Sequence, residues 1–160
     1  MSYPEPKYLS DEGEVSAVFR PADTAPELVT RGGTRTHYLA TTASSGGEFG
    51  LYRVDMPPKA GGPKSHFHKA ISESFFILEG TVRLYDGDAW TDGKAGDFLY
   101  VPQGGLHAFR NDSDEPASML LLFTPGAPRE EYFEKVAEVA AQWPPERQAE
   151  FFLEHDTYWV

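Results

Sequence analysis

Short runs of β-forming residues, separated by Gly, Pro, Asn and Asp, fill the middle of the chain. Apolar runs of this length, bounded by turn residues, predict β-strands. Glu79-Gly80 is a typical tight turn between two of them, and Asp86-Gly87-Asp88 is a second turn. Several short strands at close spacing favour a sandwich or a barrel. We expect strands over 36–42, 48–56, 75–78, 81–85, 97–101 and 119–123.

The pattern changes to helical periodicity over residues 129–155. Glu130 and Glu131 stand in the first turn, where the helix dipole favours acidic side chains. Pro144-Pro145 ends this helix, and a second short helix is predicted from Pro145 to about residue 155, with Phe151 and Phe152 on its buried face. We expect both helices to pack on the outside of the β domain, with a subunit contact as the alternative.

Residues 1–34 are rich in Pro, Glu and Asp and contain one short apolar run, Val15 to Phe19. Prolines at 4, 6, 21 and 26 disfavour a helix, so this region is predicted to be an extended arm with at most one edge strand. The predicted division is therefore an N-terminal arm over 1–34, a β-barrel over 35–126 and a C-terminal helical extension over 127–160.

The amino-acid composition limits the possible metal ligands and binding partners. The 160 residues include no cysteine, so any metal must be held by nitrogen and oxygen ligands. The formal net charge of −11 argues against nucleic acid or an anionic membrane as a partner. No segment approaches the roughly 20 apolar residues that span a bilayer, and the polar, acidic N-terminus does not resemble a secretory signal. We therefore expect a cytoplasmic protein.

Three of the five histidines lie in two compact motifs. His66 and His68 are two apart, so on a strand both imidazoles face the same side. Glu73 begins the next strand, and His107 comes from a distant one. Three imidazoles and one carboxylate suit Fe, Ni, Mn, Co or Zn better than Ca or Mg. A lone His-x-His is more often a surface feature, and it is the joint occurrence at this spacing that indicates a metal site.

These two motifs, GGPKSHFHKAISESFFILEG (61–80) and GDFLYVPQGGLHAFRN (96–111), resemble the two signature motifs of the cupin superfamily. The first matches at both histidines, the glutamate and Gly80, although its leading glycine is displaced by one residue, to Gly61. The second matches at all its defined positions: Gly96, Pro102, Gly104, His107 and Asn111.

The resemblance implies a mainly β fold, the cupin double-stranded β-helix or jelly-roll barrel, with the metal near its axis. Carried over, the metal ligands are His66, His68, Glu73 and His107. A cupin that keeps these residues but works without a metal is the alternative. Small cupins also commonly pair through barrel faces and exchanged N-terminal arms, which implies a homodimer.

A mostly apolar, aromatic pocket is expected over the metal. Phe75 and Ile77 share the strand parity of Glu73, and Phe109 shares that of His107. Tyr52 and Val54, or else Leu51 and Arg53, would line the wall from an earlier strand. Plain core packing is the alternative for each of them. The expected ligand is a small aromatic or apolar molecule.

Among small cupins the chain looks most like the quercetinase type, which implies a dioxygenase acting on an aromatic or enolic, flavonol- or polyketide-like substrate. Glu73 is the predicted catalytic residue, because a weakly bound carboxylate can accept the substrate's hydroxyl proton. Two alternatives remain open. One is a redox-neutral cyclase, isomerase or decarboxylase that uses the same Lewis-acid site. The other is a binding barrel without catalysis.

Overall fold

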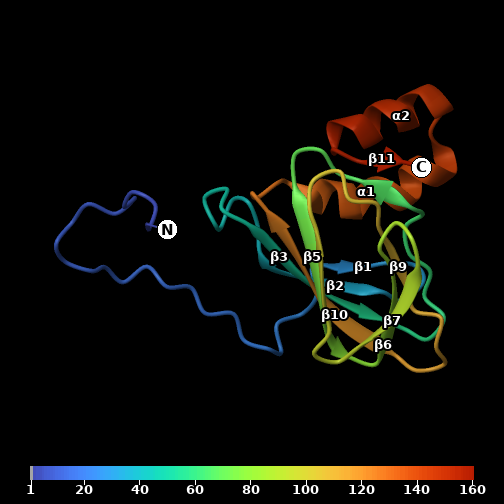
Figure 1. The fold of residues 1–160 in the computed structure, drawn as a ribbon, viewed down its shortest axis with the longest axis horizontal. Coiled ribbons are helices and arrows are strands. Elements are labelled where there is room, and N and C mark those ends of the chain that lie inside the picture. The colour runs from blue at the N-terminus through green and yellow to red at the C-terminus, as the bar shows by residue number, and fades with distance from the viewer. Residues whose placement is uncertain (1) are drawn as a thin grey trace.

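A computed structural model describes residues 2–160. Two antiparallel sheets form the barrel (Figure 1). The larger sheet has the strand order β1-β2-β3-β10-β5-β8, and the smaller has the order β7-β6-β9. The strands are β1 (Leu28–Val29), β2 (Arg35–Ala40), β3 (Gly50–Met56), β4 (His66–Phe67), β5 (Ser72–Glu79), β6 (Thr81–Tyr85), β7 (Trp90–Lys94), β8 (Phe98–Val101), β9 (Ala108–Arg110), β10 (Ala117–Thr124) and β11 (Tyr158–Trp159).

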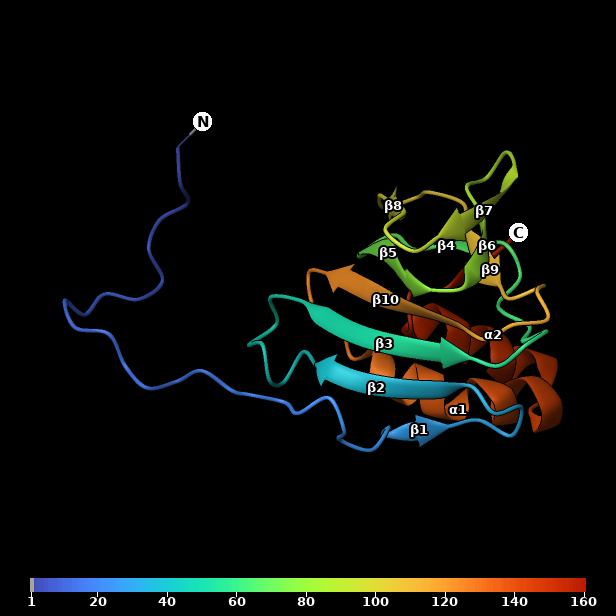
Figure 2. The same cartoon turned by 90° about the horizontal axis from the view of Figure 1, so that it is seen from below.

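The core lies between the two sheets. Buried and less buried residues alternate along β3 and β10, because successive side chains of a strand point to opposite faces. β10 is the central strand of the larger sheet and pairs with β3 on one side and β5 on the other. Figure 2 shows these strands side by side. The predicted mainly β, double-stranded β-helix fold is confirmed.

Tight turns let consecutive strands fold back into the barrel. Gly80 joins β5 to β6 with a positive φ of 70°. A Cβ atom at this position would lie 2.3 Å from the Pro116 carbonyl oxygen, so a larger residue would collide with the backbone. The glycine of the Glu79-Gly80 turn therefore meets a steric requirement of the barrel as well as a conformational one.

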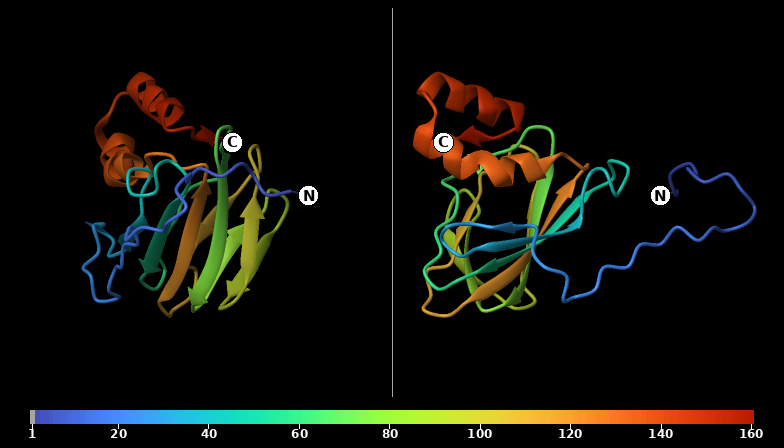
Figure 3. Two further views of the ribbon diagram at one scale, coloured as in Figure 1. Left: turned by 90° about the vertical axis from the view of Figure 1, so that its left-hand side faces the viewer. Right: turned by 180° about the vertical axis from the view of Figure 1, so that it is seen from behind.

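The C-terminal region forms α1 (Arg129–Gln142) and α2 (Pro145–Glu154), close to the predicted bounds. Proline at the start of α2 fits the first helical turn, where no backbone donor is needed. After α2 the chain returns to the barrel, and β11 pairs with β4 (Figure 3). Helix α1 contacts the barrel directly, because its Phe133 side chain packs against the barrel core.

Residues 2–27 form no helix or strand and extend away from the barrel in Figure 1. The edge strand of the N-terminal region is β1, which pairs with β2, and the apolar run Val15–Phe19 lies outside it. Neither of the two helices in residues 2–160 has the length and hydrophobicity that a membrane-spanning helix needs.

Candidate metal centre

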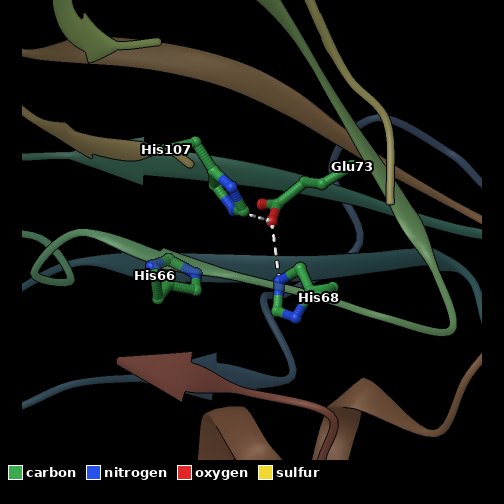
Figure 4. A group of neighbouring side chains, drawn as sticks. All are labelled: His66, His68, Glu73 and His107. Atoms are coloured by element: carbon green, nitrogen blue, oxygen red, sulfur yellow. Dashed lines mark hydrogen bonds and ion pairs between the residues drawn. The ribbon is translucent and has the colours of Figure 1, made fainter. Parts of the chain in front are cut away.

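Four side chains from separate parts of the chain converge inside the barrel (Figure 4). His66 lies in β4, His68 follows that strand, Glu73 lies in β5, and His107 immediately precedes β9. A backbone bridge between His66 and His107 fixes the two motifs against each other. One potential ligand atom from each side chain lies within 4.8 Å of the others, and all four residues are buried. The four residues that the two motifs predict as ligands are therefore brought together.

Main-chain carbonyls set the orientation of the three imidazoles. Nδ1 of His66 is 2.8 Å from the Lys64 carbonyl oxygen, and Nδ1 of His107 is 2.9 Å from that of Gly105. Nδ1 of His68 is 2.5 Å from the Asp156 carbonyl oxygen. A carbonyl only accepts, so each Nδ1 must donate its proton. In the neutral ring, each Nε2 then carries a lone pair, and hydrogen bonds of this kind are typical of metal-bound histidines.

The donor set fits a divalent transition metal. Oε2 of Glu73 lies 2.9 Å from Nε2 of His107 and 3.2 Å from Nε2 of His68. With neutral imidazoles, these groups are all acceptors directed at one another, an arrangement that a shared cation would satisfy. Metal–ligand bonds are about 2.0–2.2 Å long for imidazole and carboxylate ligands. The cluster is thus compatible with one transition metal ion.

The close packing of these buried groups shifts their pKa values in different directions. Burial, followed by the nearby His107 charge, lowers the pKa of His66 to about 4, so its ring is neutral at pH 7. Burial alone would raise the pKa of Glu73, but hydrogen bonds that His107 and His68 donate when their rings are protonated outweigh it and hold the pKa well below its usual value. Burial tends to lower the pKa of His107, and the Glu73 carboxylate more than reverses this, so that the pKa is raised. Glu73 is therefore a carboxylate at neutral pH.

A cavity of about 470 Å³ opens beside the cluster and is lined by His66 and Glu73. Most of its other lining residues are apolar. They come from the larger sheet, from β9 of the smaller sheet, from the loop before β4, from α1 and from the C-terminus, and include Val54, Leu121, Phe109, Phe133, Val136 and Trp159. The centre thus faces a space with the size and character of a small-molecule site.

The predicted pocket residues separate into two groups. Phe109 lines the cavity, whereas Tyr52, Phe75 and Ile77 are fully buried in the barrel core. The Phe75 ring packs behind His107, with 5.9 Å between the ring centroids. The Tyr52 hydroxyl donates to Glu130 of α1 at 2.7 Å, so this side chain joins the barrel to the helix. Strand parity alone does not distinguish such core positions from the cavity wall.

Arg129 and Trp159 line the cavity but were not singled out by the sequence motifs. Arg129 begins α1, where a basic side chain opposes the helix dipole. A basic residue at the start of a helix is electrostatically unfavourable. In the sequence, this suggests that Arg129 is kept there by an interaction outside the helix. Trp159 packs against His66, with 5.2 Å between the ring centroids, and its position is set by the pairing of β11 with β4.

The other two histidines lie away from the centre. Nε2 of His37 is 3.2 Å from Oδ2 of Asp55 and 2.9 Å from an Arg53 nitrogen. His155 ends α2, and its Nδ1 lies 2.8 Å from the Phe151 carbonyl oxygen.

Residues 52–123 match the family described as "Cupin domain". A 74-residue segment, 43% of this chain, is 35% identical to the quercetin 2,3-dioxygenase of Bacillus subtilis (strain 168), of which it covers 20%. An 80-residue segment, 46% of this chain, is 36% identical to germin-like protein subfamily 2 member 3 of Arabidopsis thaliana, of which it covers 35%. The matched part therefore spans much less than the full length of either relative.

Among solved structures, the chain is similar to a predicted oxalate decarboxylase from Thermotoga maritima, with a TM-score of 0.60 and 21% identity. The alignment covers 67% of this chain and 97% of that chain. At this identity the similarity supports the fold alone.

Proposed function

We propose that this protein is a metal-dependent dioxygenase that acts on an aromatic or enolic substrate. The observation that carries the proposal is the direct opening of the apolar cavity onto His66 and Glu73. An aromatic molecule in this space would have its oxygen substituents next to the metal ligands. The partial similarity to a quercetin dioxygenase supports the same reaction class.

A bound divalent metal would supply Lewis acidity toward a substrate oxygen. With four protein ligands, the ion would keep room for a substrate oxygen or another small molecule. His66, His68 and His107 would hold the ion, and their carbonyl partners would keep the rings in place. The identity of the metal among Fe, Ni, Mn, Co and Zn follows availability as much as ligand type.

Glu73 has a second role in this proposal. Its carboxylate is buried next to the cavity and can accept the proton of a substrate hydroxyl in the site. The apolar wall excludes water, which strengthens the electrostatic interactions of the substrate anion. In the overall reaction both atoms of dioxygen enter the organic substrate, so no external reductant is consumed.

The test is oxygen uptake by protein loaded with each candidate metal, with flavonols and related aromatic enols as substrates. We expect uptake with at least one metal. Glu73→Gln should lower the rate per bound metal by about 10²–10⁴-fold, the range typical of a general base. Uptake with none of the metals and substrates would overturn the proposal. A rate that falls only in proportion to metal content would exclude the proton-transfer role of Glu73.

A redox-neutral reaction on a carbonyl substrate, as a cyclase, isomerase or decarboxylase, is the second candidate. The observation that favours it is the buried Arg129 guanidinium on the cavity wall, because a fixed positive charge stabilises an enolate without any oxidant. Turnover of the substrate under anaerobic conditions would distinguish this reaction from dioxygenation. A metal spectrum unchanged by every candidate ligand would instead indicate a binding barrel without catalysis.

A further inference from the structure

The Arg129 side chain is a buried cation with an unused hydrogen-bonding edge. Only 4% of the residue is exposed. One terminal nitrogen, Nη1, donates to the His155 carbonyl oxygen at 2.6 Å. Nε is buried and has no hydrogen-bond partner among the described residues. A buried donor without a partner destabilises the folded chain, so its presence needs an explanation.

Aromatic rings hold the guanidinium in place on the cavity wall. Its central carbon lies 4.2 Å from the centroid of the Tyr132 ring and 5.4 Å from that of Phe123. These contacts, together with the bond to His155, fix the plane of the group. They neutralise none of its charge, because neither the rings nor a carbonyl oxygen carries a formal negative charge.

Glu73 is the acidic group that most favours the charged form of Arg129. Glu73 is also a ligand of the proposed metal centre, so its negative charge would be shared with the ion. With the metal bound, the buried site as a whole becomes positively charged. A buried positive charge in an apolar cavity is costly unless an anion accompanies it.

We propose that Arg129 binds the carboxylate of the substrate, and that the substrate is therefore an apolar, most simply aromatic, carboxylic acid. The Nε edge of a guanidinium presents parallel donors that match the two oxygens of a carboxylate. The apolar lining, including Phe109 and Phe133, accommodates the body of the acid. This inference rests on the proposed function, since it names the substrate class of the same site.

Binding of benzoate, compared with uncharged benzamide, tests the assignment directly. The two probes are similar in size and differ in charge. We would measure both by calorimetry and by visible absorption, using Co(II)-loaded protein under anaerobic conditions. Benzoate should bind at least about tenfold more tightly than benzamide, which corresponds to about 1.4 kcal/mol. Equal binding of the two probes, or no detectable binding of benzoate, would overturn the proposal without any variant being needed.

Variants of Arg129 test the residue itself. Arg129→Gln should abolish the preference for benzoate, and Arg129→Lys should restore part of it, because lysine keeps the charge but lacks the planar fork. Arg110→Gln is the matched control, since Arg110 pairs with Asp112 and does not line the cavity. A preference that persists in folded, metal-loaded Arg129→Gln protein would show that another group binds the carboxylate.

The outcomes separate this inference from the proposed function. Anaerobic preference for benzoate without oxygen uptake on any substrate, hydroxylated benzoates included, would support the role of Arg129 and contradict the dioxygenase. Oxygen uptake without a preference for benzoate would support the dioxygenase and contradict the role of Arg129.

Discussion

The main-chain carbonyl of Asp156 accepts a hydrogen bond from Nδ1 of His68 at 2.5 Å, across 88 residues of sequence. The Asp156 carboxylate also accepts bonds from the amides of Lys69 and Ala70, at 2.9 and 2.8 Å. One C-terminal residue therefore holds both an imidazole of the four-residue cluster and the loop that follows it. Groups that orient a ligand in this way commonly affect metal affinity as well as geometry.

We expect Asp156→Ala to weaken metal binding by about 10–100-fold, because the loop after His68 loses its acceptors. Asp156→Asn should weaken metal binding less than Asp156→Ala does. Asparagine keeps one side-chain carbonyl oxygen as an acceptor and tolerates the positive φ of 50° at this position. Competition with a chromophoric chelator would measure the affinity. The control is Asp88→Ala, in an exposed turn before β7. Equal affinity of Asp156→Ala and wild type would show that the Asp156 carboxylate does not support the centre.

Loss of one imidazole should distinguish the metal centre from the other histidines. His107→Ala should lower metal affinity at least about tenfold. At a free metal concentration of 100 times the wild-type Kd, the metal-dependent increase in unfolding free energy should then fall from about 2.7 kcal/mol to about 1.4 kcal/mol or less. His37→Ala is the matched control, because His37 is also buried but pairs with Asp55. Elemental analysis and thermal unfolding with and without chelator would measure both effects. An equal loss of metal in the two variants would contradict the assignment.

Asp55 should make stability depend on pH outside the metal centre. Burial raises the pKa of Asp55, but the Ser118 hydrogen bond and the Arg53 charge outweigh burial and lower it. A lowered pKa means that the stabilisation is present above the unfolded value of 3.8 and is lost as pH falls through the folded value. Asp55→Asn should therefore reduce the unfolding free energy at about pH 7, by about 1 kcal/mol because the group is partly screened by solvent.

Urea unfolding of wild type and Asp55→Asn at several pH values would measure this difference, which should shrink as the solution becomes more acidic. Asp88→Asn, at an exposed position, serves as the control. A difference between Asp55→Asn and wild type that stays constant down to about pH 2 would show that the charge of Asp55 does not contribute.

We expect the protein to be a homodimer in solution, with the N-terminal arm contributing to the contact. Exposed apolar side chains on the arm support this expectation. Val18 and Phe19 are 94% and 87% exposed, and a second chain would remove them from water. Light scattering would measure the mass of the full chain and of a variant lacking residues 1–26. A full-length monomer at micromolar concentration would contradict the dimer, and an unchanged dimer in the truncated variant would exclude the arm.

Local features of the sequence were sufficient for six of the strands, β2, β3, β5, β6, β8 and β10, and for the two helices. Buried and less buried side chains alternate along β3 and β10, as expected for strands with one face in the core. Pro144-Pro145 separates α1 from α2, as predicted. The spacing of His66, His68, Glu73 and His107 was also sufficient to single out the cluster, because each motif carries its own residues at fixed separations. β7 and β9 were not predicted: β7 contains Asp92 and Gly93, and β9 has only three residues.

Only the tertiary structure decided what surrounds the centre. The periodicity of α1 indicates which face is apolar, but it does not show that Arg129 reaches the cavity beside Glu73. The contact between Asp156 and His68 depends on α2 turning the chain back toward β4. Likewise, Phe109 lines the cavity while Phe75, of equally suitable parity, packs in the core. Local pattern specifies the type of element and its buried face, whereas contacts across the chain depend on how those faces pack together.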